Sequence, residues 1–260
     1  MRHHTVKTKD VRKFDQANDD LLNTEGIERM GILCGHPGTG KTTALMLMAN
    51  KYDAVFVRAS ACSTITTILG DLCESLGYVG KNGRRMQRRD DMYRYICQHL
   101  VEDAETGRAL APRPIFIDEA DYCLRHLDVL DILRDIYDST SCPTILIGME
   151  NIARTIQENG RFARRISQWI EFEGLDLEDT TLVAQELCEI EVMPDLIEYI
   201  HAETVGNIGR TKIGLDKVER WARANRKDSV SLAEWGERPL YYDQSLFGKD
   251  SKRPGPKGRR

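Results

Sequence analysis

A glycine-rich segment near the start of the chain has the residue types that bind a nucleoside triphosphate. Its three glycines let the backbone fold round phosphate groups and direct N–H groups at them, and the helix-forming run that follows adds the positive end of its dipole. Lys41 is expected to hold the β- and γ-phosphates, and the Thr42 hydroxyl to bind Mg²⁺, which prefers oxygen ligands. The expected nucleotide contacts are Gly35, His36, Pro37, Gly38, Thr39, Gly40, Lys41, Thr42 and Thr43.

Two consecutive carboxylates follow an apolar run further along the chain. The run 114–117 leads into Asp118 and Glu119, as in a strand that ends beside bound phosphates. Asp118 is expected to hold Mg²⁺ through water, and Glu119 to orient and deprotonate an attacking water. A second acid is typical of hydrolysis rather than of phosphoryl transfer to a small molecule. The alternative, an acidic helix cap, applies better to Asp121.

Further polar residues are candidates for contact with the γ-phosphate. Asn151 follows the apolar run 144–147 and is the expected γ-phosphate sensor, with a plain helix N-cap as the alternative. Arg165, with Arg164 as second candidate, can serve as an arginine finger for a neighbouring subunit; solvated helix charge is the alternative. Arg210 either contacts the phosphates from the helical C-terminal part of the chain or is an ordinary surface residue.

Composition describes a water-soluble globular protein. The 260 residues are 41% hydrophobic and 30% charged, with a net charge of −4. No apolar run is long enough to span a membrane, so we expect a cytoplasmic location and no membrane partner. The seven cysteines form no Cys-x-x-Cys pair, so we expect reduced thiols. The charges are segregated, because the segment 171–198 holds ten acids and no Lys or Arg, whereas both ends are basic.

Short apolar runs alternate with helical patterns up to Phe172. Strands are expected at 30–34, 54–57, 114–117, 144–147 and 169–172, and such alternation predicts a parallel sheet with helices on both faces. After Phe172 the strands are expected to stop, and Ser231 with Glu234 predicts a capping box for the last helix. The expected division is a basic tail at 1–14, an α/β P-loop core at 15–174, a helical lid at 175–240 and a basic tail at 241–260.

The order of these motifs resembles the AAA+ ATPases over roughly residues 15–235. The segment 118–121 and the run 146–151 look like those of the DNA-transposition ATPases of the phage Mu B and TnsC type, and secretion ATPases of the same branch share most of these features. The resemblance implies ATP and Mg²⁺ as ligands. It also implies ATP-dependent assembly into rings or helical filaments, in which the finger completes the neighbour's site.

A basic cluster in the middle of the chain is the best internal candidate for DNA contact. Such a cluster neutralises phosphates without reading bases, although a solvated helix start balanced by Asp90 and Asp91 is the alternative. Together, the AAA+ resemblance and this basic cluster predict an ATPase that oligomerises on duplex DNA without sequence specificity, selects transposition targets and recruits and stimulates a transposase. A helicase loader or replication-initiation ATPase, or a secretion-type ATPase, is the alternative. The cluster comprises Lys81, Arg84, Arg85, Arg88 and Arg89.

Overall fold

The computed structural model describes residues 1–2, 4–24, 28–80, 85–103 and 106–241, apart from the side chain of Leu127. The chain divides into two compact units. The first is Thr5–Leu175, and the second joins Met1–His4 to the chain from Asp176 onward. Most of the tail expected at 241–260 lies outside the described residues.

A five-stranded sheet forms the centre of the first unit, in the order β2-β3-β4-β1-β5. Every neighbouring pair is parallel, which confirms the predicted sheet. Because β4 lies between β3 and β1, the carboxyl ends of these three strands meet at one edge of the sheet, where ligands of such sheets bind. The strands are β1 (Met30–Gly35), β2 (Val55–Arg58), β3 (Ile115–Asp118), β4 (Thr144–Ile147) and β5 (Ile166–Phe172).

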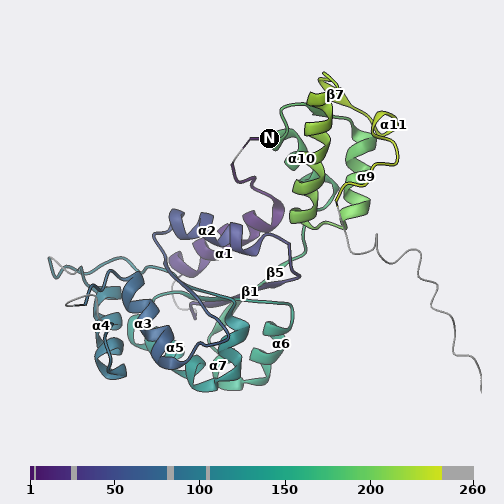
Figure 1. The fold of residues 1–260 in the computed structure, drawn as a ribbon. Helices are drawn as coiled ribbons and strands as arrows, with labels where there is room; N and C mark the ends of the chain where they lie inside the picture. The colour runs from purple at the N-terminus through teal and green to yellow at the C-terminus, as the bar shows by residue number, and fades with distance from the viewer. Residues whose placement is uncertain (3, 25–27, 81–84, 104–105, 242–260) are drawn as a thin grey trace, which may run out of the picture. The chain divides into compact units, whose positions relative to one another are not determined.

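Helices cover both faces of this sheet (Figure 1). Alternate strand residues point to opposite faces, so Phe116 packs with α1 and α2 while Ile115 and Ile117 pack with the other helices. Burial on both faces explains why the strands read as continuous apolar runs. One face carries α1 (Lys9–Asn23) and α2 (Lys41–Lys51); the other carries α3 (Ile65–Ser75), α4 (Arg89–Val101), the 3₁₀ helix η2 (Ala120–Arg125), α5 (Leu127–Thr140), α6 (Asn151–Glu158) and α7 (Gly160–Ala163).

Helix α1 begins inside the segment that the sequence assigned to a basic tail. The Thr8 side chain caps it by accepting a hydrogen bond from the Val11 N–H. Phe14 is fully buried, with its ring centroid 5.8 Å from that of Phe116. The missed signal is the apolar spacing Val11, Phe14, Ala17 and Leu21, which follows one face of a helix.

The second unit is mainly helical. Two very short parallel strands, β6 (Glu191–Val192) and β7 (Ser229–Val230), pair within it, so the expectation that strands stop at Phe172 is wrong. Two residues are too few to give a strand pattern in a sequence. The predicted capping box of Ser231 and Glu234 is confirmed. The helices are α8 (Leu177–Leu187), α9 (Pro194–Thr204), α10 (Ile208–Ala224) and α11 (Leu232–Trp235).

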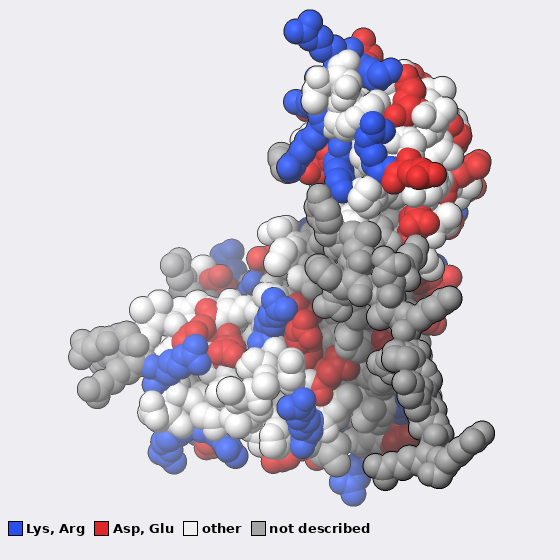
Figure 2. Space-filling view, turned by 45° about the vertical axis from the view of Figure 1, so that its right-hand side comes forward, with Lys and Arg blue, Asp and Glu red and all other residues white. Residues whose placement is uncertain are grey.

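Charge is divided unevenly within the second unit. Residues 176–207 carry nine acids and no Lys or Arg, whereas residues 208–241 carry eight Lys or Arg and five acids. Lys and Arg accordingly gather on one side of this unit and Asp and Glu on the other (Figure 2). In neither unit does a described helix have the length and apolar character needed to cross a membrane.

Candidate nucleotide-binding site

The glycine-rich loop connects β1 to α2, as the sequence predicted. Gly38 and Gly40 have backbone φ angles of 82° and 95°, which residues other than glycine rarely adopt. A Cβ on Gly35 would lie 2.5 Å from the Phe172 carbonyl oxygen, so the loop also needs glycine where it leaves the strand. No side chain caps the N-terminus of α2. Its first backbone N–H groups can therefore bind an anion.

Lys41 lies in this loop, close to several carboxylates. Its ammonium donates to the carbonyl oxygens of Gly35 at 2.6 Å and His36 at 2.8 Å. Burial lowers the pKa of Lys41, and the charges of Asp121, Glu150 and Glu119 act in the opposite direction. The P-loop cation and the acids from the ends of β3 and β4 therefore belong to one electrostatic cluster.

Asp118 is the buried last residue of β3. Its Oδ1 accepts from the Glu119 N–H at 3.0 Å, while its buried Oδ2 has no hydrogen-bond partner among the described residues. Burial raises the pKa of Asp118, and the Arg58 guanidinium and the Thr42 hydroxyl lower it. The Thr42 hydroxyl therefore lies close to the Asp118 carboxylate, and the role of both residues at a magnesium ion stays a prediction.

This donor set fits Mg²⁺. Thr42 and Asp118 would hold the ion, the latter through water, with phosphate oxygens completing its shell. A bound ion would neutralise charge on the phosphates. Within the described ranges there is no group of three or more His, Cys, Asp or Glu that could hold a metal without the nucleotide.

Glu119 leaves the strand in a strained conformation. Its φ of 54° places it in the left-handed region, which is uncommon outside glycine and clusters at functional sites. Arg58, at the end of β2, lies 3.2 Å from Glu119 Oε1 through Nη2 and 4.0 Å from Asp118 Oδ2 through Nε. Sequence reasoning missed Arg58, although as the last residue of the neighbouring strand it lies in register with Asp118.

The loop after β4 is tied to both of these segments. Asp121 Oδ2 accepts from the Met149 N–H at 2.9 Å, and His36 Nδ1 lies 3.4 Å from Glu150 Oε2. Asp121 therefore holds this loop, and its predicted role as a helix cap is wrong, because η2 has no side-chain cap. Glu150 occupies the N-cap position of α6, and Asn151 is the first residue of that helix.

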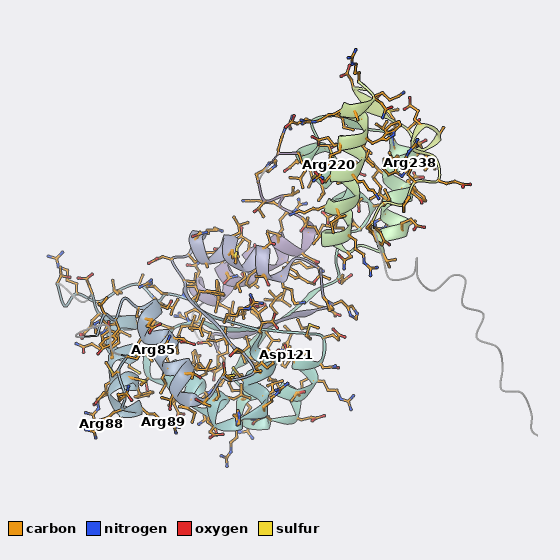
Figure 3. The ribbon with its side chains drawn as sticks, viewed as in Figure 1. Arg85, Arg88, Arg89, Asp121, Arg220 and Arg238 are labelled. Carbon is orange, nitrogen blue, oxygen red and sulfur yellow. The ribbon has the colours of Figure 1, made fainter. Side chains whose placement is uncertain are left out.

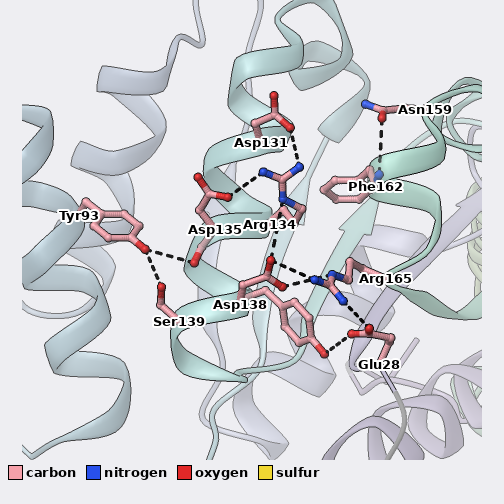
Figure 4. A network of polar contacts seen from close by, with 11 residues as sticks. Glu28, Tyr93, Asp131, Arg134, Asp135, Asp138, Ser139, Asn159, Phe162 and Arg165 are labelled. Carbon is pink, nitrogen blue, oxygen red and sulfur yellow. Dashed lines mark hydrogen bonds and ion pairs between the residues drawn. The ribbon is translucent and has the colours of Figure 1, made fainter.

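Arg165 is at the start of β5, beside Met30 and therefore at the end of the sheet opposite the P-loop. Its guanidinium contacts Glu28 at 2.5 Å and Asp138 at 3.2 Å, within a wider polar network (Figure 4). Tyr137 donates to the same Glu28 at 2.8 Å. Arg164 is exposed, and no side-chain partner is found for it in the described parts of the chain.

Arg210 lies in the second unit, whereas the other candidate nucleotide residues lie in the first. It belongs to the first turn of α10, where its N–H donates to Asn207 Oδ1 at 3.0 Å. Its guanidinium lies 5.3 Å from the centre of the Tyr241 ring. Its role as a lid sensor stays a prediction.

The described part of the basic cluster, Arg85, Arg88 and Arg89, lies at the junction of α3 and α4, the two helices between β2 and β3 (Figure 3). Arg85 is bound by acids of α3, with Nε 2.6 Å from Glu74 and Nη1 3.1 Å from Asp71. Arg88 is 79% exposed, and Arg89 donates to Thr66. Val79, 87% exposed, lies in the same connection. Lys81 and Arg84 lie outside the described residues.

Residues 25–156 match the sequence model of the AAA domain family, and this match spans half of the chain, so the protein belongs to that family. It is an AAA-type P-loop protein. No sequence of a curated protein matches it.

Solved structures show the same fold. Cdc6p of Pyrobaculum aerophilum gives a TM-score of 0.62 at 17% identity, over 88% of this chain and 65% of that one. The ORC2 protein of Aeropyrum pernix in its ADP form gives a TM-score of 0.62 at 16% identity, over 89% of this chain and 67% of that one. The ORC1 protein of the same organism in complex with DNA gives a TM-score of 0.58 at 17% identity, over 85% of this chain and 61% of that one. The chain thus spans about two thirds or less of these proteins, and the likeness concerns the fold alone.

Replacing Lys41 tests the nucleotide site. Lys41→Ala removes a cation that can make charge-assisted bonds to phosphate oxygens, each contributing about 1.5–3 kcal/mol, so ATP affinity should fall about tenfold to a hundredfold or more. Calorimetric titration with ATP measures this. Lys51→Ala, at the other end of α2, is the matched control and should bind ATP as the wild type does. Equal affinity in both variants would contradict the assignment.

Proposed function

We propose that this protein hydrolyses ATP with Mg²⁺ and, when ATP is bound, assembles on duplex DNA without sequence specificity. The observation that carries the catalytic part is the buried Oδ2 of Asp118, which accepts no hydrogen bond among the described residues, beside Thr42 and with Glu119 next in the chain. Arg58 reaches this oxygen only at 4.0 Å, and a buried carboxylate oxygen without a hydrogen bond costs free energy unless a closer cation or donor completes it, which supports a metal-assisted reaction.

The roles of the residues follow from their positions. The loop N–H groups and Lys41 bind and orient the phosphates, and Asp118 and Thr42 hold the metal ion. Glu119 accepts a proton from the water that attacks the γ-phosphate. Asp121 positions the backbone of the loop that carries Asn151, the residue we assign to orienting that water. Arg58 fixes the carboxylate of Glu119 through their ion pair.

Glu119→Gln should separate binding from hydrolysis. The amide keeps the size of the side chain but cannot accept a proton as the carboxylate does, so we expect kcat to fall about a hundredfold or more. ATP affinity should stay within about twofold, because Glu119 makes no phosphate contact in this scheme. Phosphate release and ATP titration measure the two quantities. Glu150→Gln, at another acid near Lys41, is the control for charge alone.

We assign the arginine finger to Arg164 rather than to Arg165. Arg165 is held by Glu28 and Asp138, whereas Arg164 is exposed at the sheet end that faces away from its own P-loop. Arg165 then fixes the start of β5. This assignment reverses the preference expected from sequence, because the ion pairs of Arg165 are visible only in three dimensions.

Mixing two inactive variants tests the finger. Arg164→Ala binds ATP but lacks the finger, whereas Lys41→Ala binds ATP weakly but still has the arginine that completes a neighbour's site. Each alone should lose at least about a thousandfold in kcat, the scale of an arginine finger, and their mixture should regain activity. Arg165→Ala should instead lower the melting temperature. Full activity of Arg164→Ala would refute the assignment.

DNA contact is supported by the connection between α3 and α4. Arg88 and Arg89 lie at the start of α4, and Val79 adds an exposed apolar side chain to the same connection. Arg85 is a weaker candidate, because Glu74 and Asp71 already neutralise it. Cations of this kind contact phosphates and give affinity without base recognition.

Reversing two of these charges tests the interface. Arg88→Glu with Arg89→Glu should weaken ATP-dependent binding to a duplex about tenfold or more and flatten its salt dependence, since phosphate contacts release counterions. Fluorescence anisotropy at several salt concentrations measures both effects. Arg154→Glu, an exposed arginine of α6, is the matched control. A wild-type protein that ignores duplex DNA with ATP would refute the DNA-binding function.

Two biological settings fit such an ATPase. Selection of transposition targets with recruitment of a transposase rests on the resemblance of the segments 118–121 and 146–151. Replication initiation or helicase loading is supported by the fold shared with Cdc6p and the ORC proteins. Preference for single-stranded DNA would favour helicase loading, and stimulation of a transposase on duplex DNA would favour transposition.

A further inference from the structure

A groove in the second unit combines an apolar floor with an acidic rim. It has a volume of about 420 Å³ and is lined by α8, β6 and the start of α9. Ala184, Val192 and Ile197 are buried in its floor, and Leu177, 41% exposed, lies at its edge. A hollow of this character accepts an apolar side chain from another molecule.

The rim selects the charge of the occupant. Glu189, Glu191 and Glu198 line the groove, and Arg223 pairs with Glu189 at 2.6 Å. Glu191 and Glu198 have no ion-pair partner in the described chain, and residues 176–207 contain no Lys or Arg. The groove therefore repels nucleic acid and attracts a cationic surface.

Helix α10 of the same unit has the complementary character. Ile213 is 57% exposed on its outer face, so it offers an apolar side chain between charged neighbours. Arg220, two turns further on, is 78% exposed and pairs with Asp216 on its own helix. Lys212 adds a further charge beside Ile213. An ion pair so exposed contributes little and is easily exchanged for another.

We propose that α10 of one copy docks into the α8–β6–α9 groove of a second copy. Ile213 enters the apolar floor, and Lys212 and Arg220 face Glu191 and Glu198. The two surfaces differ, so the contact is head-to-tail, and each added copy leaves a groove and a helix exposed for the next. This inference rests on the proposed function, because it names a surface through which the ATPase assembles.

Charge reversal on each surface tests the contact in the 260-residue chain. The groove variant carries Glu191→Lys with Glu198→Lys, and the helix variant carries Lys212→Glu with Arg220→Glu. Each alone should weaken ATP-dependent association at least about tenfold in sedimentation velocity, because like charges then meet. An equimolar mixture should associate as the wild type does, because reversed grooves meet reversed helices and the unmodified surfaces still match. Glu203→Lys, on α9 outside the groove, is the control and should assemble normally.

The possible outcomes distinguish failure of this contact from failure of the proposed function. If the wild-type protein stays monomeric with ATP, both the proposed assembly and this contact are refuted. Single variants that assemble as well as the wild type overturn the contact alone. A mixture that stays dissociated also overturns it, and the four substitutions combined in one chain show whether the lost association comes from charge or from misfolding, since that chain is again self-complementary.

Discussion

The parallel pairing of β1, β4 and β3 is the constraint on which the nucleotide site depends. It brings three strand ends to one edge, so that the loop after β1, the acids after β3 and the polar loop after β4 converge. Two side-chain contacts then connect these loops directly, from Asp121 to the Met149 N–H and from His36 to Glu150. A shift in either strand pair would separate Thr42 from Asp118, the two residues proposed to hold a metal ion.

Much of this site could be predicted from sequence, because the P-loop is one continuous segment, the two acids are adjacent residues, and each of these motifs directly follows a buried strand. Arg58 could not be found in the same way. Its only relation to Asp118 is the register of β2 against β3, which sequence spacing does not fix. Asp121 was misassigned for a similar reason, since its partner is a backbone N–H in a loop 28 residues away. Short β6 and β7 depend on tertiary pairing and carry no pattern of their own.

Basic residues that cluster in the sequence are not all able to bind a partner, because neighbouring acids already pair with some of them. Arg85 belongs to a run rich in basic residues, yet two acids of α3 hold it. Arg165 likewise lies between Glu28 and Asp138. Conversely, the basic character of α10 is diluted in the sequence by Asp216 and Glu219, but Glu219 is buried, so it adds little negative charge to the surface. Burial, which sequence spacing does not give, decides which charges face a partner.

The position of Arg58 solves an electrostatic problem that adjacent acids create. Asp118 is buried, and the charge of Glu119 beside it raises the pKa of Asp118 further, which disfavours the ionised form that a metal needs. The guanidinium of Arg58 acts against both effects while contacting Glu119 through another nitrogen. A bound Mg²⁺ would supply the same counter-charge at Asp118, so the proposed site would then need Arg58 less. The ion pair with Glu119 is partly exposed, so Arg58 would hold this carboxylate near the end of the strand without binding it so tightly that it could not accept a proton from water.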